Sequence, residues 1–172
     1  GYKDLYNATF NFRTDTSSKF GPGNKRAYFP SLSVSWNISN EEFLADNNHI
    51  NILKLRASAG KVGSTNVSDF AYLQFFQNNS SSVYNGNSGI IADDNFPNPN
   101  VGWETTNEVN LGLDFGFFKN RLSGNFDVYK NITSDLLINF PVPGSGYDFQ
   151  YRNMGETQNT GFEATINVVA IE

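Results

Sequence analysis

Residues 101–137 contain two long runs in which apolar and polar side chains alternate. Small or polar residues separate the apolar residues of the first run, which are Val109, Leu111, Leu113, Phe115 and Phe117. Alternation with a period of two predicts a β-strand that has one apolar and one polar face. The pattern restarts after Lys119-Asn120, with Leu122, Phe126, Val128 and Ile132. The segment therefore predicts two antiparallel strands joined by a turn of two residues.

The length of these two runs limits what their apolar face can contact. Strands of soluble proteins typically have ~5–6 residues. Each run here has about ten residues or more, close to the ~9–11 that a tilted strand needs to cross a bilayer. The apolar face is therefore expected to meet either a large protein core or lipid.

The composition also differs from that of an average soluble domain. The chain has 172 residues, the size of one domain, with 16 Phe, 8 Tyr and 2 Trp, and only 17% of its residues are charged. Soluble domains usually have ~25% charged residues. No apolar run reaches the ~18 residues of a transmembrane helix. This absence does not exclude a membrane β-barrel, whose strands give a weaker signal in the sequence.

Several classes of function are disfavoured by residue content. The chain has no cysteine, which rules out disulfides and thiolate metal sites, and its net charge of −5 argues against nucleic-acid binding. His49 is the only histidine, so no second histidine or cysteine can assist it in catalysis, and we expect it to be structural. Asp93-Asp94 lacks the spacing of a calcium loop. We expect no catalytic residue, metal or cofactor.

Four other segments alternate in the same way. We predict strands at residues 6–12, 28–38, 53–60 and 162–168, and a short strand or half of a hairpin at 70–76. Residues 39–50 and 119–120 form the shorter connections, and residues 15–26, 63–102 and 139–155 the longer ones. Ser39 and Glu42 match a capping box, which predicts a short helical turn.

These connections predict how the strands are arranged. Up-and-down membrane barrels have short periplasmic turns and long extracellular loops, and six crossings place all the long loops on one side. The sequence thus predicts an all-β, antiparallel up-and-down segment of a transmembrane β-barrel with about six strands. Asn120 is expected to face the periplasm, and Trp103 and Leu137 the outside.

Five motif blocks follow one another in a fixed order along the chain. They begin with RTDTSSKFG at residues 13–21 and continue at 28–43, 53–63, 98–137 and 153–163. Together they resemble the SusC/RagA-type TonB-dependent outer-membrane transporters of Bacteroidetes, although Thr16 stands where the family usually has glycine. The resemblance covers nearly all of the chain and is weakest at residues 64–97.

The resemblance implies a barrel of about 22 strands that is closed by an N-terminal plug domain, in a much longer chain. Residues 1–172 would be part of the barrel domain. The plug is expected to lie outside this chain. The final strands are also expected to lie outside it, because Ile171-Glu172 lacks the terminal aromatic of an intact barrel. The targeting signal is expected to lie outside it too, because the N-terminus does not have the features of one.

The resemblance also implies a function in the outer membrane. The whole protein would take up nutrients by importing oligosaccharides or peptides, without enzymatic activity. The implied partners are the rest of the barrel and plug, a SusD-like surface lipoprotein, TonB, outer-membrane lipid and the glycan or peptide cargo. A soluble or secreted carbohydrate-binding β-sandwich is the alternative, in which the same alternation buries a core between two sheets.

Candidate contacts with cargo come from aromatic residues of the long loops. The rings of Tyr147, Phe149 and Tyr151 could stack on sugars or peptide side chains, or could pack against a hairpin, a loop or a lipoprotein. The same two interpretations apply to Phe75, Phe76 and Tyr84. The polar residues between the apolar positions of the long hairpin could line the solute path or contact the plug; these include Asn110, Asp114, Asn125 and Asp127.

Overall fold

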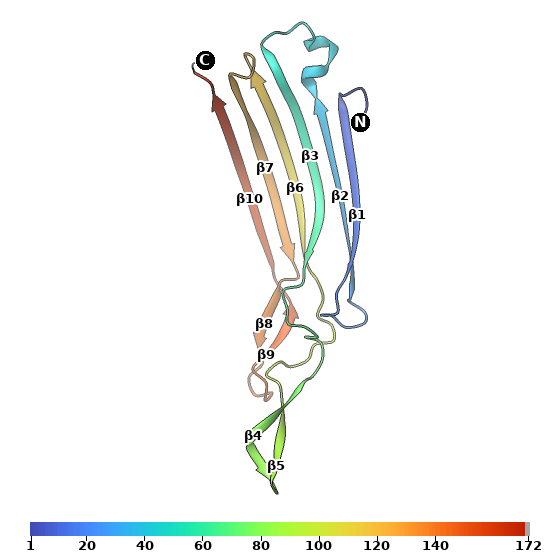
Figure 1. Ribbon diagram of the computed structural model, residues 1–172, viewed down its shortest axis with the longest axis vertical. Coiled ribbons are helices and arrows are strands. Elements are labelled where there is room, and N and C mark those ends of the chain that lie inside the picture. Colours follow the sequence, from blue (N-terminus) through green and yellow to red (C-terminus); the bar gives the residue numbers. More distant parts are fainter. Residues whose placement is uncertain (171–172) are drawn as a thin grey trace.

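The computed structural model describes residues 1–170, apart from the side chains of residues 80, 82 and 84, and centres on one six-stranded antiparallel sheet (Figure 1). Its strands are β1 (Tyr6–Thr16), β2 (Arg26–Asn37), β3 (Ile50–Ser64), β6 (Glu104–Phe117), β7 (Leu122–Ser134) and β10 (Glu156–Val168). They lie side by side in this order, and every neighbouring pair is antiparallel. The prediction of six up-and-down strands is confirmed. Ile171 and Glu172 lie outside the described residues.

β6 and β7 form the long hairpin that the alternation predicts. Leu113 pairs with Phe126 and Leu111 with Val128, which puts these four residues on one face of the sheet. Directly opposite residues of an antiparallel pair share a face. Asp114 therefore lies beside its partner Asn125 on the other face.

The turn between β6 and β7 is longer than the predicted two residues. It consists of residues 118–121, and three of them have left-handed φ angles: Phe118 (55°), Lys119 (57°) and Asn120 (62°). The Phe118 main-chain N–H donates to the His49 carbonyl oxygen at 2.8 Å, and the two rings meet edge-on at 5.7 Å. His49 thus has contacts that fit the structural role predicted for it.

Two small hairpins extend beyond one end of the sheet (Figure 1). One pairs β4 (Phe76–Tyr84) with β5 (Asn87–Ala92), and the other pairs β8 (Leu137–Pro141) with β9 (Phe149–Asn153). The short strand predicted at 70–76 is wrong, because residues 70–75 are turns and irregular chain. That hairpin begins only at Phe76.

The connections differ at the two ends of the sheet. Residues 17–25, 65–103 and 135–155 lie at the end with the hairpins, and residues 38–49 and 118–121 lie at the end with both termini (Figure 1). The 38–49 connection is longer than the 17–25 connection, so loop length separates the ends less cleanly than predicted. Within 38–49 are two short 3-10 turns, η1 (Ile38–Asn40) and η2 (Glu42–Leu44), and neither has a side-chain cap. The predicted short helical turn is thus present as 3-10 turns, but the capping box of Ser39 and Glu42 does not form.

The apolar face of the six-stranded sheet is uncovered. Phe10 is 67% exposed, Leu111 56% and Phe162 64%. A β-sandwich would cover this face with a second sheet. Both small sheets instead project beyond the end of the large one, so the sandwich alternative does not hold for the described residues (Figure 1). No helix within residues 1–170 is long and apolar enough to cross a membrane.

The main buried cluster lies in the connections, at the end of the sheet that carries the hairpins. This loop core consists of Phe20, Val67, Ala71 and Val101. Half-buried side chains that include Trp103 and Tyr151 pack against it. The Lys19 ammonium, next to Phe20, donates to the main-chain carbonyls of residues 65 (3.1 Å) and 67 (2.7 Å). The connections are thereby held together by their own packing.

We predict that Phe20→Ala loosens the loop core and leaves the sheet intact. Phe20 has no exposed surface, and removing a buried phenylalanine side chain costs about 3–5 kcal/mol. Main-chain amides of residues 65–72 and 98–101 should exchange hydrogen faster, as measured by mass spectrometry, with β6 and β7 unchanged. Phe43→Ala is the control, since Phe43 is 70% exposed. Equal exchange in both variants would contradict the prediction.

Candidate functional site

The polar face of the sheet lines up hydrophilic side chains from all six long strands. One row follows from the register of five strand pairs and consists of Asn7, Ser35, Arg56, Gly112, Asp127 and Glu163. Each strand contributes one residue, because opposite residues in an antiparallel sheet share a face. The row brings together side chains that lie far apart in the sequence.

Arg56 joins two carboxylates at the centre of this face. Its Nε and Nη2 donate to the two oxygens of Asp114 at 2.9 and 2.8 Å, in the bidentate geometry that guanidinium and carboxylate favour. Nη2 also donates to Asp127 at 3.1 Å. The Asn125 amide donates to the second oxygen of Asp127 at 2.6 Å. One guanidinium between two carboxylates leaves a negative charge uncompensated.

Gly112 makes this arrangement possible. It lies between Arg56 and Asp127 in the row, on the intervening strand β6. A Cβ at Gly112 would lie 2.7 Å from Arg56 Cζ and 2.5 Å from Asp127 Oδ1. Only glycine therefore leaves room for the guanidinium to cross β6 in this position.

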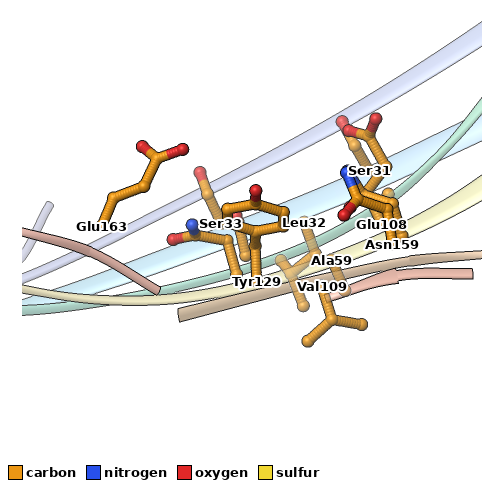
Figure 2. Close-up of a pocket in the computed structure, with 13 residues that line it drawn as sticks. Ser31, Leu32, Ser33, Ala59, Glu108, Val109, Tyr129, Asn159 and Glu163 are labelled. Carbon is orange, nitrogen blue, oxygen red and sulfur yellow. The ribbon is translucent and has the colours of Figure 1, made fainter. Parts of the chain in front are cut away.

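A groove of about 520 Å³ lies next to this network (Figure 2). Its polar lining includes Glu108, Tyr129, Asn159 and Glu163, which Figure 2 shows on one side of the sheet, with Val109 on the other. Among the described residues, neither glutamate has an ion-pair partner. The groove is thus negative and rich in hydroxyl, amide and carboxylate groups. Such groups can hydrogen-bond to a hydroxyl-rich or a positively charged solute.

The predicted polar residues of the long hairpin do share one face. Asp114 and Asp127 meet at Arg56, Asn125 donates to Asp127, and Asn110 lines the groove. Arg56 was not predicted as their partner, although its place among the polar residues of its strand was a signal. Glu108, Tyr129 and Glu163 were not predicted as a group either. Only the register of three strands, β6, β7 and β10, brings these together.

The three predicted aromatic residues lie in or just before β9. The Tyr147 ring packs on Phe96 at a centroid distance of 5.0 Å. Phe149 meets Tyr151 edge-on at 5.4 Å, and the Tyr151 hydroxyl lies 3.0 Å from the Ser68 hydroxyl. Phe149 and Tyr151 therefore help to hold the loops together. Contact with cargo remains a prediction for all three.

The other candidates of the long loops have main-chain contacts or stay exposed. The Asp94 carbonyl accepts a hydrogen bond from the Asp148 N–H at 3.0 Å, so the acidic turn connects two loops. Within residues 1–170, no group of three or more His, Cys, Asp or Glu could hold a metal ion. Phe75 and Phe76 are 45% and 65% exposed. The Tyr84 side chain lies outside the described part of the chain.

Comparison with known proteins gives matches along almost the whole chain. Residues 2–169 match the family described as TonB dependent receptor-like, beta-barrel. The TonB-dependent receptor P3 of Formosa agariphila is 42% identical, and the TonB-dependent receptor SusC of Bacteroides thetaiotaomicron is 38% identical, each over 172 residues and 96% of this chain. The chain spans 17% of the length of both relatives. The structure of the RagAB peptide transporter superposes with a TM-score of 0.91 at 31% identity, covering 100% of this chain and 19% of that one.

We predict that Arg56→Met destabilises the protein by about 2 kcal/mol. Hydrogen bonds to charged groups contribute ~1.5–3 kcal/mol, and partial exposure of Arg56 and Asp114 screens part of that energy. Thermal unfolding of the whole protein measures the effect. The combined variant R56M/D114N/D127N should recover stability, because it removes the two carboxylates that would repel each other.

The matched control is Arg13→Met, which breaks the exposed pair of Arg13 and Asp15. Exposed pairs contribute ~0–1 kcal/mol, so this variant should unfold close to the wild-type temperature. If R56M unfolds like R13M, the Arg56 network does not stabilise the sheet.

Proposed function

Since the chain belongs to the TonB-dependent receptor-like β-barrel family, whose members are transporters rather than enzymes, we propose that it forms part of the wall of an outer-membrane barrel that imports nutrients. The resemblance to SusC/RagA-type transporters is confirmed by the family match over residues 2–169 and by the identity with SusC. The all-β barrel fold is confirmed by the RagAB superposition.

The uncovered apolar face is the observation that carries this proposal. One of its rows crosses all six long strands without a polar side chain: Ala8, Val34, Ala57, Leu111, Val128 and Phe162. Leaving such a surface in water costs about 25 cal/mol for each Å². The six strands are 11–15 residues long, which is enough for the ~9–11 that span a bilayer. Lipid is the solvent that suits this face.

The two edges of the sheet support a larger closed barrel. Within the described residues, no strand pairs with the outer side of β1 or of β10. An open edge exposes unpaired main-chain N–H and C=O groups, which the hydrocarbon region does not tolerate. We propose that other strands of the same protein pair with both edges, so that residues 1–172 form one part of a barrel domain. A plug domain would then lie against the polar face.

The orientation follows from the connections. Long loops of membrane barrels lie outside the cell and short turns lie in the periplasm. The end with the loop core and the two small hairpins is therefore the extracellular end in this proposal. Asn120, in the turn between β6 and β7, would face the periplasm. This agrees with the orientation expected from the sequence.

The cargo and the energy source are the parts of the proposal that rest most on relatives. We propose an oligosaccharide or a peptide as cargo, a SusD-like lipoprotein that captures it, and TonB as the source of energy. The identity with SusC and the superposition on a peptide transporter support this assignment. The groove at Glu108, Tyr129 and Glu163 supports a polar solute path. The barrel wall would gate and guide the cargo without bond chemistry.

We predict that Leu111→Arg lowers the amount of folded receptor in the outer membrane. An arginine on the lipid face at the bilayer midplane costs about 2–4 kcal/mol. Asn110→Arg is the matched control, since Asn110 is the neighbour of Leu111 on β6 and faces the polar side of the sheet. The folded fraction is measured by heat-dependent migration of the full-length receptor in outer-membrane preparations. Equal assembly of both variants would show that the apolar face does not meet lipid.

We predict different effects for two of the loop tyrosines. Tyr147→Ala should slow uptake of cargo by intact cells without changing hydrogen exchange at residues 65–72, because Tyr147 packs on Phe96 and lies outside the loop core. Tyr151→Ala should speed hydrogen exchange at residues 65–72, since its ring packs on the loop core. Normal uptake by the Tyr147 variant would remove this residue from the candidate cargo contacts.

A further inference from the structure

The charged residues of the apolar face all lie in the half of the face nearest the small hairpins. Strand register places Arg26, Lys61, Lys130 and Glu156 on this face, toward the end with the small hairpins. Among the described residues, the rest of the face has no charged side chain. Ser134 donates a hydrogen bond to Glu156 at 3.0 Å, whereas neither Lys61 nor Lys130 has an ion-pair or hydrogen-bond partner within residues 1–170. This half of the apolar face is positive in a chain whose net charge is −5.

The two lysines lie close enough to act on one group. Lys61 pairs with Asn107, and Lys130 pairs with Val109, the next residue of β6 on the same face. They are therefore two strand spacings and one pleat apart, roughly 12 Å between Cα atoms. Their flexible four-carbon stems can bring both ammonium groups to a single anion above Asn107.

An apolar groove of about 300 Å³ leads away from Lys61. Phe10, Pro30, Leu32 and Ala59 line it, and Lys61 and Asn107 form its polar end. Phe10 is 67% exposed and Leu32 50%, so no part of the described chain covers the groove. A shallow apolar groove with a cation at one end matches an acyl chain attached to an anionic headgroup.

The level of the lysines in the membrane is marked by aromatic residues. Phe12 and Tyr28 stack at a centroid distance of 6.0 Å on the apolar face, next to the row that contains Lys61. Aromatic residues of membrane barrels gather at the interface between hydrocarbon and headgroups. Lys61 lies near this level, and Lys130 lies one pleat deeper, from where its long stem can carry the ammonium group towards the lipid phosphates.

We propose that Lys61 and Lys130 bind the phosphate of an anionic lipid whose acyl chain lies along the Phe10–Leu32 groove. The occupant is a lipid because the positive charge and the apolar groove adjoin on the face that meets the membrane. A soluble acidic ligand without an acyl chain would leave the apolar groove unfilled. This site rests on the proposed function, since it requires the apolar face to meet lipid.

The test compares two lipids that differ only in the phosphate. The full-length receptor in detergent is mixed with phosphatidic acid or with diacylglycerol of the same acyl chains, and bound lipid is counted by native mass spectrometry. The wild type should retain phosphatidic acid preferentially. K61Q/K130Q should weaken its binding roughly thirty-fold, since each basic residue near an anionic surface contributes about 1 kcal/mol. Lys54→Gln, on the same strand as Lys61 but on the polar face, should bind like the wild type.

Three outcomes would overturn the lipid site. They are equal retention of the two lipids by the wild type, unchanged binding of phosphatidic acid by K61Q/K130Q, and displacement of the lipid by inorganic phosphate. The first two would leave the lysines as solvated residues at the headgroup level, and the third would indicate a free-phosphate site. Failure of the proposed function looks different, because L111R and N110R would then assemble equally well whatever lipid is bound.

Discussion

Cross-strand register is the constraint on which the rest of this structure depends. Opposite residues share a face, so the period-two pattern of each long strand becomes a surface only when all six strands align. A slip of one residue in any strand would move its apolar side chains to the polar face. The alignment produces both the apolar row at Leu111 and the polar row at Asp127. It also brings Arg56 within hydrogen-bonding distance of two carboxylates on neighbouring strands.

The sheet and the connections are stabilised in different ways. The sheet is held by its main-chain ladder and by cross-strand contacts such as the stack of Phe115 on Phe126 at 5.3 Å. Its apolar face has no protein partner among the described residues, so lipid takes the place of a core in our proposal. The connections have a conventional buried core around Phe20 and Val101. This core fixes the end of the sheet that our proposal places outside the cell, where cargo would first meet the protein.

The sequence predicts local features of this chain better than features that depend on register. Alternation is visible within one strand, and all six long strands were predicted from it. The β4–β5 and β8–β9 hairpins were missed because β8 and β9 have only five residues each and β4 is a mostly polar run, so none of these strands shows a clear period. The turn at 118–121 was predicted too short because its left-handed residues are not glycines. The ion pairs of Arg56 and the space above Gly112 depend on which residues face each other, which no single segment shows.

The central claim is that one face of the sheet meets lipid and the other meets water. Spin labels placed one at a time at residues 109–114 of the full-length receptor in bilayers test it directly. Our account predicts that lipid-soluble oxygen relaxes labels at Val109, Leu111 and Leu113, and that a water-soluble nickel chelate relaxes labels at Asn110, Gly112 and Asp114. Accessibility without a period of two, or odd-numbered labels shielded from oxygen, would contradict the account.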